Sequence, residues 1–487
     1  MQTGTTPTTL DPATCEQARL TRDARFDGLF FTAVKTTGIY CRPVCPAPTP
    51  KPANITYYPS AAAAAAAGFR PCLRCRPEAA AGSPLHHASS DLVGAALQLI
   101  EQGALDGQSV SALAARIGVG ERHLRRLFDS ELGASPQDVA ATRRLLFAKQ
   151  LLGETRLPIT AVAAAAGYAS LRRFNAAFVD AYAKPPREFR RGQGRPSDER
   201  AIELRLPYRP PYDFKGMLEF YARRCIPRVE SIDAHGYRRS ISIEGEPGWF
   251  EVSAIKGDSA LRLRVHEVRP LHLGTLVNRV RRMFDVNADP AAIMRTLGRE
   301  PRLRMLVKRW PGQRLPGTWD GFELGVRAVL GQQISVAAAR TLAARVVDRY
   351  GTAHPASADG GLGALFPQPA DLVDAPLESI GLTRARAATI RSLAQACVEG
   401  RVDFRAVQTL DATLTRLCAL PGIGMWTAQY MAMRAHAHPD AFPAGDLVLR
   451  KIAGEGTPIS ERAMHAIAEA WHPWRAYAVM LLWRSAG

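Results

Sequence analysis

The chain has 487 residues, too many for one hydrophobic core, and this length predicts three or four domains of ordinary size. Its composition is that of a globular protein, and no apolar run is long enough to span a bilayer, so we expect no membrane span. The net charge is +18, and the basic excess is spread over the whole chain. Such a charge favours a polyanion such as nucleic acid, although a membrane surface or solubility alone would also explain it.

Four cysteines near the start have the spacing Cys-x3-Cys followed by Cys-x2-Cys. Two close pairs of soft thiolates can complete a tetrahedral zinc site with little loss of chain entropy. The expected zinc ligands are Cys41, Cys45, Cys72 and Cys75. The other cysteines are scattered, and residues 1–5 show no secretory signal, so we expect a reducing compartment, the cytoplasm. On spacing alone, a purely structural zinc knuckle is the simplest interpretation.

The residues around these cysteines, 31–43 and 68–72, closely resemble the N-terminal methyl-acceptor domain of Ada-type alkylation-response proteins. The resemblance implies that all four cysteines bind zinc and that Cys41 takes a methyl group from a DNA phosphotriester. A zinc-bound thiolate is nucleophilic at neutral pH, and methylation would remove one negative charge that faces the DNA. We therefore expect methylation to tighten DNA binding. The residues expected to meet phosphates are Thr37, Arg42 and Arg70.

Between the two cysteine pairs lie seven alanines, 61–67, which predict a short helix because alanine is the best helix former and Gly68 stands at a C-cap position. Linker composition at 79–84 and at 191–197 predicts domain boundaries. The expected domains are residues 1–82, 83–195, 200–287 and 288–487.

Two similar helical pairs lie in the second domain. Residues 110–120 and 121–132 predict a helix, a glycine turn and a second helix, and the pattern recurs at 159–182. One such pair could be an ordinary helical hairpin, but the repeat and its ending at 184–189 resemble an AraC-type DNA-binding domain. Polar residues that point away from the apolar faces are expected to contact bases or phosphates: Arg122, Arg125, Arg126, Arg172 and Asn175.

Residues 200–285 alternate apolar and polar side chains at 202–206, 240–244 and 261–265, which predicts strands. Helical patterns return from residue 289. The expected fold class is multidomain α+β: a small zinc module, an all-α double helix-turn-helix domain, an α+β domain and an all-α domain.

The string at 420–428 predicts a helix-hairpin-helix in the last domain, a DNA clamp that does not read sequence. Gly422 and Gly424 allow positive φ and a close backbone approach, and the next helix offers free N–H groups to a phosphate. An ordinary tight turn is the alternative. Together with residues 326–335 and with Asp446, 22 residues after Gly424, the string resembles the helix-hairpin-helix glycosylases that remove alkylated bases, specifically the AlkA type, over residues 200–487.

This second resemblance implies excision of a base from an extruded nucleotide, with Asp446 stabilising an oxocarbenium-like transition state. Trp426, Tyr430 and Trp483 match the family's base pocket, where a cationic base gains cation–π contact, although each could be a core residue instead. Gln333 matches a residue that wedges into the duplex. No lysine lies between the second hairpin glycine and the aspartate, so we expect a monofunctional glycosylase without lyase activity.

We therefore expect one chain that accepts methyl groups at Cys41, regulates transcription and hydrolyses the N-glycosidic bond of alkylated purines such as 3-methyladenine. The expected cofactor is zinc, and the expected partners are double-stranded DNA, both damaged and promoter, and RNA polymerase. We also expect a monomer. No Pro-Cys-His-Arg motif occurs, so direct repair of O6-methylguanine is not expected. The alternative function is a zinc-dependent regulator whose glycosylase half only binds DNA.

Overall fold

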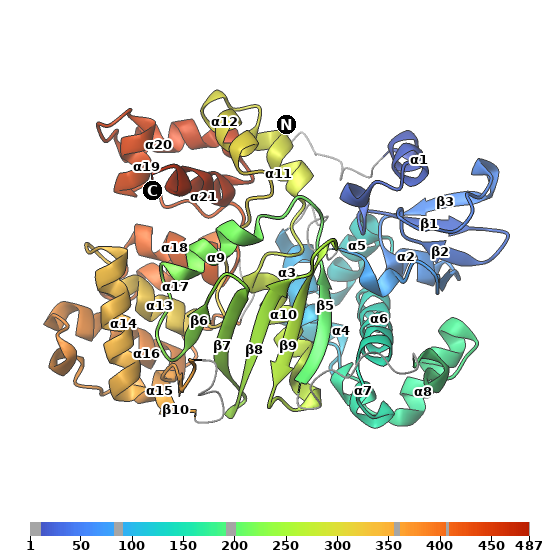
Figure 1. The fold of residues 1–487 in the computed structure, drawn as a ribbon, viewed down its shortest axis with the longest axis horizontal. Coiled ribbons are helices and arrows are strands. Elements are labelled where there is room, and N and C mark those ends of the chain that lie inside the picture. The colour runs from blue at the N-terminus through green and yellow to red at the C-terminus, as the bar shows by residue number, and fades with distance from the viewer. Residues whose placement is uncertain (1–10, 82–90, 191–200, 355–360, 406–408, 487) are drawn as a thin grey trace.

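A five-stranded sheet stands in the middle of the molecule, with the C-terminal helices on one side and the N-terminal half of the chain on the other (Figure 1). The computed structural model describes residues 11–81, 91–190, 201–354, 361–405 and 409–486. The expected multidomain α+β architecture is confirmed. The boundaries expected at 82–83 and at 195–200 lie outside the described residues. Within the described ranges, no helix combines the length and the apolar character needed to cross a membrane.

The N-terminal module is built on a small four-stranded sheet. Its elements are α1 (Pro12–Leu20), β1 (Phe31–Val34), β2 (Ile39–Cys41), β3 (Ile55–Tyr58), α2 (Ala61–Ala66) and β4 (Arg70–Pro71). The alanine run forms α2 as predicted, because Ser60 Oγ caps its start, accepting from Ala63 N at 3.0 Å, and Gly68 turns the chain after its end with a φ of +86°. β4 then pairs with β2, which brings the second pair of cysteines beside the first.

Residues 91–190 contain two helix-turn-helix units joined by a long helix, as the repeated pattern predicts. The helices are α3 (Asp91–Glu101), α4 (Val110–Arg116), α5 (Glu121–Leu132), α6 (Pro136–Glu154), α7 (Ile159–Ala165) and α8 (Leu171–Tyr182). Leu124 and Phe128 of α5 pack in a core shared with α3 and α4. Phe174 and Phe178 of α8 belong instead to a core that continues into the central sheet. The second unit is therefore held against the α+β domain by packing.

The α+β domain consists of an antiparallel sheet in the order β5-β9-β8-β7-β6 and two helices. Its elements are β5 (Ala201–Pro207), α9 (Phe214–Ala222), β6 (Glu230–Ile232), β7 (Gly236–Ile243), β8 (Glu246–Ala254), β9 (Ala260–His266) and α10 (Leu273–Met283). The three predicted strands form β5, β7 and β9. Buried side chains such as Leu204, Phe250 and Val265 pack with Val277 and Val280 of α10, so the alternation of the sequence follows a sheet with one buried face.

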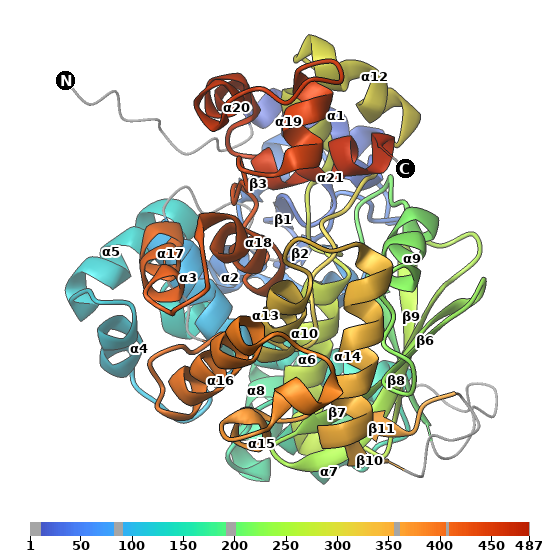
Figure 2. The ribbon, with the colours of Figure 1, turned by 90° about the vertical axis from the view of Figure 1, so that its left-hand side faces the viewer.

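The C-terminal domain is helical. Its helices are α11 (Pro290–Leu297), α12 (Pro301–Arg309), α13 (Gly321–Leu330), α14 (Val336–Tyr350), α15 (Pro369–Leu372), α16 (Arg384–Val398), α17 (Leu410–Cys418), α18 (Met425–Ala435), α19 (Leu447–Ala453), α20 (Glu461–Ala468) and α21 (Arg475–Ser485), and a short pair of strands is β10 (Thr352–Ala353) and β11 (Ala364–Leu365). α13 is buried along most of its length. Figure 2 shows α12 and α19–α21 as a layer above α13, α14, α16 and α18.

Two buried polar contacts fix the N-terminal module against the other domains. Lys149 Nζ of α6 lies 2.8 Å from Glu78 Oε2, and the two side chains are 6% and 2% exposed. Arg209, fully buried, donates from Nε to the carbonyl of Asp27 at 2.9 Å and from Nη1 to that of Asn287 at 3.0 Å. Buried charges need all their partners in place, so these contacts favour one arrangement of the domains.

Candidate metal centre and C-terminal pocket

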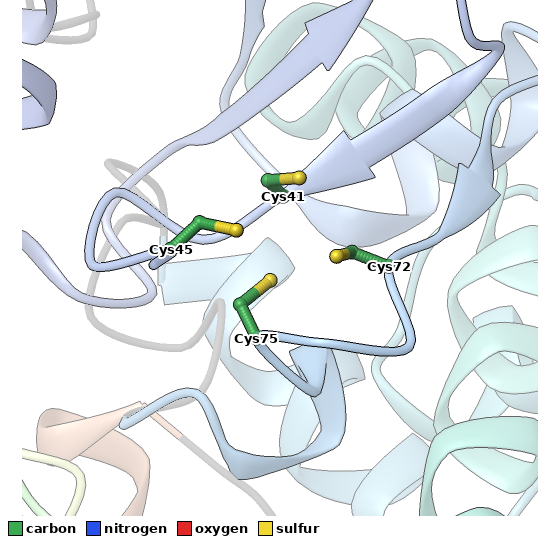
Figure 3. Close-up of side chains that lie close together, drawn as sticks. All are labelled: Cys41, Cys45, Cys72 and Cys75. Atoms are coloured by element: carbon green, nitrogen blue, oxygen red, sulfur yellow. The ribbon is translucent and has the colours of Figure 1, made fainter. Parts of the chain in front are cut away.

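Four cysteine side chains point to a common centre in the N-terminal module (Figure 3). Cys41 ends β2, Cys45 lies in the turn after it, and Cys72 and Cys75 follow β4. Their sulfur atoms all lie within 4.8 Å of one another. Zinc bound tetrahedrally by thiolates has Zn–S distances of about 2.3 Å and hence S–S distances of about 3.8 Å. The spacing and the soft donor set therefore fit zinc, and these four residues form the zinc site.

Cys41 and Cys45 are more accessible than the second pair of cysteines. Both are partly exposed, whereas Cys72 and Cys75 are 7% and 6% exposed. Arg70 N donates to the carbonyl of Gly38 at 2.7 Å, directly before the start of β2, and Arg70 pairs with Ile39 of that strand. The exposed side chains of Arg70 and Thr37 thus lie near the start of β2, the strand that ends at Cys41.

Arg42 lies inside the module, contrary to the expectation that it meets phosphate. Its Nε donates to Asp27 Oδ1 at 2.8 Å, and its Nη1 donates to the Cys75 carbonyl at 3.0 Å. Its backbone N–H donates to Cys75 Sγ at 3.3 Å, a contact that stabilises a thiolate. Asp27 is a buried carboxylate that needs a cation, which explains the inward orientation. Arg42 supports the metal centre from within.

The second helix of each helix-turn-helix unit carries the predicted DNA-binding side chains. Arg122 and Arg126 are exposed on α5. Arg125 is partly engaged, because its Nε donates to Glu121 Oε1 at 2.9 Å on the same helix. Two exposed residues of α8 form no side-chain hydrogen bond or ion pair with any residue that the structure describes: Arg172 and Asn175. Arg172 and Asn175 are therefore available to nucleic acid, whereas Arg126 Nη2 lies 3.1 Å from His123 Nδ1, and the roles of all five residues stay predictions.

The glycine hairpin between α17 and α18 needs its two glycines for different reasons. Gly422 has a φ of +83°, and a Cβ at this position would overlap Thr389 Oγ1. Gly424 has a φ of −88° and precedes α18 as its N-cap, and no atom lies within 4 Å of where its Cβ would be. Gly422 therefore makes the turn possible, whereas Gly424 leaves open space beside the free N–H groups of α18, as the approach of a phosphate requires.

Gly422→Ala is expected to lower the free energy of unfolding by about 1–3 kcal/mol, because alanine is strained at this positive φ and would press on Thr389. Gly424→Ala is the matched control, and its stability should change by less than about 0.5 kcal/mol because its φ suits alanine. Denaturant unfolding measures both variants. Equal losses in the two would contradict this assignment of the turn.

A cavity of about 500 Å³ is lined by residues of α14, α18 and α21 and by Asp446. Asp446 is the N-cap of α19, and its Oδ1 accepts from Leu449 N at 3.0 Å. The same carboxylate accepts from the indole Nε1 of Trp426 at 3.1 Å and from that of Trp483 at 3.2 Å. Three donors fix the orientation of the carboxylate at the cavity wall. The structure therefore brings together the aspartate and the aromatic residues that the sequence placed in one pocket.

Tyr430 completes the aromatic wall. Its ring is stacked on that of Trp426, with centroids 5.5 Å apart and planes 5° apart. Arg434 Nη1 donates to the Tyr430 hydroxyl at 2.8 Å. Burial raises the pKa of Tyr430, but the guanidinium groups of Arg434 and Arg224 outweigh this and lower the pKa to about 8. The pocket thus combines a carboxylate and a readily ionised phenol with electron-rich rings, which favours a cationic ligand.

A spectrophotometric titration should detect one tyrosine with a pKa of about 8 in the wild type and none in Tyr430→Phe. Because the pKa of Tyr430 is lower in the folded chain than in the unfolded one, its ionisation adds stability that grows as the pH rises from about 8 to about 10. The wild type should therefore gain stability relative to Tyr430→Phe over that range and not below it. A difference in unfolding free energy that does not change with pH would contradict the shift.

Gln333 lies in the loop between α13 and α14, next to the hairpin. Its side chain is exposed, and its φ of +57° is unusual for a residue other than glycine. The preceding Gln332 donates from Nε2 to the Gly422 carbonyl at 3.0 Å and to Thr427 Oγ1 at 3.1 Å. Such backbone strain persists where neighbouring contacts hold it. The loop therefore presents Gln333 beside the hairpin, and its wedge role stays a prediction.

The sequence did not reveal the arginines of the pocket. Five line it: Arg223, Arg224, Arg327, Arg340 and Arg434. Arg434 could have been found, because it follows Tyr430 by four residues and shares its helix face. Arg223 and Arg224 follow α9 of the α+β domain, more than 200 residues before Asp446, so no local pattern connects them with the pocket.

Four protein families match consecutive stretches of the chain. Residues 14–78 match the metal binding domain of Ada, and residues 113–192 match a helix-turn-helix domain. Residues 203–320 match the AlkA N-terminal domain, and residues 326–476 match the HhH-GPD superfamily of base excision DNA repair proteins. This order defines a class of protein that combines an Ada-type metal centre and a helix-turn-helix domain with a base excision repair domain.

Relatives cover both the whole chain and its C-terminal half. A Mycobacterium tuberculosis protein named probable bifunctional transcriptional activator/DNA repair enzyme AlkA is 39% identical over 96% of this chain and 95% of its own length. The DNA-3-methyladenine glycosylase 2 of Escherichia coli is 34% identical over 58% of this chain and 97% of its own. The chain belongs to this family of bifunctional AlkA-type transcriptional activators and DNA repair enzymes. A 3-methyladenine DNA-glycosylase structure from Archaeoglobus fulgidus shares the fold, with a TM-score of 0.51 at 21% identity over 57% of this chain and 96% of that one.

Proposed function

We propose that Asp446 is the catalytic carboxylate with which this chain hydrolyses the N-glycosidic bond of alkylated purines such as 3-methyladenine. The supporting observation is a carboxylate held by two indole N–H groups at the wall of an aromatic-lined cavity. The nucleotide must be extruded, because the bond is inaccessible in the base stack. When the bond breaks, its electron pair leaves with the base and positive charge develops at C1′. Asp446 stabilises this charge until water adds to C1′ and loses a proton.

The pocket selects the lesion by charge. A purine methylated at N3 or N7 is cationic, which makes it both a good leaving group and a ligand for aromatic faces, worth roughly 0.5–2 kcal/mol for each cation–π contact. Trp426 and Tyr430 offer parallel rings, and Trp483 lies against Tyr430 with centroids 6.2 Å apart. Among the described residues, no lysine lines the cavity, which supports release by water without a Schiff base.

In the N-terminal module, Cys41 is the proposed methyl acceptor. Its thiolate attacks the methyl carbon of a methylphosphotriester, so that an S–C bond forms, the C–O bond breaks and the phosphodiester leaves as an anion. Bound zinc keeps the thiol deprotonated. Arg70 and Thr37, near the start of the strand that ends at Cys41, contact the phosphate. Methylation removes one negative charge that faces the DNA, and the reduced repulsion raises affinity.

The helix-turn-helix units connect this chemistry with transcription. Arg122 and Arg126 of α5 and Arg172 and Asn175 of α8 contact promoter DNA, and the bound chain recruits RNA polymerase. The net charge of +18 supports a DNA-bound protein. We propose that the chain acts as a monomer in the cytoplasm.

One experiment tests both chemical activities. The purified chain is incubated with methylated DNA, released bases are identified by chromatography, and protein methylation is mapped by mass spectrometry. Free methylated purines and a methyl group on Cys41 are the expected results. If the chain binds DNA and accepts a methyl group but releases no base, it is instead a zinc-dependent regulator whose C-terminal half only binds DNA.

A further inference from the structure

Two of the five arginines that line the C-terminal pocket are exposed, Arg223 directly after α9 and Arg340 in the second turn of α14. They come from different domains, and both line the same cavity. These two residues are called the rim arginines below.

The other three arginines of the pocket are already engaged with the protein. Arg224 stacks over the ring of Phe220 at 3.9 Å and donates to the Phe220 carbonyl at 3.3 Å. Arg327 forms ion pairs with two buried carboxylates. Arg434 donates to two backbone carbonyls and to the hydroxyl of Tyr430. The guanidinium groups inside the pocket therefore have structural partners.

The rim arginines have no such structural partners among the residues that the structure describes. Across the described parts of the chain, neither side chain forms a hydrogen bond or an ion pair. Two unpaired cations beside a pocket for a cationic base weaken its binding, unless the bound DNA brings negative charge to the same place. The phosphates on either side of an extruded nucleotide do so, because they arrive at the pocket mouth with the base and carry the negative charge of DNA.

We propose that Arg223 and Arg340 bind the phosphates that flank the extruded nucleotide and so position its C1′ atom against Asp446. The planar guanidinium fork suits phosphate oxygens. The inference rests on the proposed function of the pocket and adds a second contact to it. The hairpin holds the duplex through backbone N–H groups, and the rim arginines hold the extruded nucleotide itself. Both are positioning residues.

The salt dependence of DNA binding tests this role. The probe is a duplex with one tetrahydrofuran abasic analogue, and its affinity is measured at several salt concentrations. Each phosphate contact contributes about 0.9 to the slope of log K against log salt. Arg223→Ala and Arg340→Ala should each reduce the slope by about 1, and the double variant by about 2. Arg223→Lys and Arg340→Lys should keep the slope, because the charge remains.

Arg349→Ala is the matched control. Arg349 is exposed on α14 like Arg340, but it lies nine residues further along the helix, about 13 Å away along its axis, and does not line the pocket. Its removal should leave the slope unchanged. An unchanged slope in the double alanine variant, or an equal reduction in Arg349→Ala, would overturn the proposal.

Single-turnover base release, measured in parallel, separates this inference from the proposed function. In the double alanine variant the enzyme concentration that gives half-maximal release should rise at least tenfold. If the wild type releases no base while the slope still falls in the rim variants, the phosphate contacts stand and the proposed catalysis is wrong. If the wild type releases base but slope and half-saturation are unchanged in the variants, only the rim assignment is wrong.

Discussion

Asp446→Asn is expected to release methylated purines about a thousandfold more slowly than the wild type. A carboxylate about 4 Å from the developing charge at C1′ stabilises it by about 4 kcal/mol at an effective dielectric constant of 20. Each 1.36 kcal/mol corresponds to about a tenfold change in rate. Asparagine keeps the shape of the side chain, and its Oδ1 can still accept from Leu449 N and Trp483 Nε1, so the fold should persist. Its amide nitrogen cannot accept from Trp426 Nε1, so one hydrogen bond is lost. The expected loss therefore comes mainly from the missing charge, together with the lost indole hydrogen bond.

Asp411→Asn is the control for this variant. Asp411 is an exposed carboxylate in the first turn of α17, in the same hairpin motif, and its replacement should leave the release rate unchanged. Rates are measured under single-turnover conditions, with thermal unfolding to check the fold. Release by Asp446→Asn at near wild-type rate would remove this residue from the mechanism. Borohydride added to the wild-type reaction should trap no protein–DNA adduct, and a trapped adduct would show lyase chemistry.

Cys41→Ser should abolish methyl transfer from DNA methylphosphotriesters. A serine hydroxyl stays protonated at neutral pH, and it is a weaker zinc ligand and a weaker nucleophile than a thiolate. The measurement is the mass of the protein after incubation with methylated DNA, followed by peptide mapping. In the wild type the added methyl group should lie on Cys41 alone.

Cys418→Ser separates a general loss of thiols from the loss of the acceptor. Cys418 is a partly exposed cysteine at the end of α17 and is not one of the four zinc ligands, so its variant should accept methyl groups like the wild type. Zinc content, measured on all proteins, shows whether Cys41→Ser has also lost the metal. Because the wild-type map does not depend on the variant, methylation at Cys45 or at any other cysteine would disprove the assignment even if Cys41→Ser fails to fold.

Many residues of the candidate sites could be predicted because their arrangement depends on neighbours that are close in the sequence. The zinc ligands are two pairs, each separated by two or three residues in a turn. The hairpin needs a positive φ at Gly422, which glycine tolerates, and Trp426 and Tyr430 share one face of α18 because they are four residues apart. Helix periodicity and turn glycines are local properties, so the pattern alone indicates them.

The orientation of Arg42 could not be predicted from its neighbours in the sequence. Its position next to Cys41 predicted a contact with DNA, but the buried carboxylate of Asp27 holds it inside the module. The spacing of Arg42 and Asp27 in the sequence carries no signal for this pair, because the contact depends on how the strands and loops of the module pack.

By itself the sequence determined the order of the domains, the four zinc ligands, the repeated helix-turn-helix and the pairing of the hairpin with Asp446. Only the tertiary structure decided which charged groups have partners. Arg42 points inward to Asp27, and Lys149 pairs with Glu78. Arg223 and Arg340 line the pocket and form no side-chain hydrogen bond or ion pair with any residue that the structure describes. The physical reason is that helices and turns follow from interactions between near neighbours along the chain. The partner of a charge is set by which surfaces meet when the chain packs. These surfaces come from segments that are not neighbours in the sequence: Arg42 and Asp27 are 15 residues apart, and Lys149 and Glu78 are 71 apart.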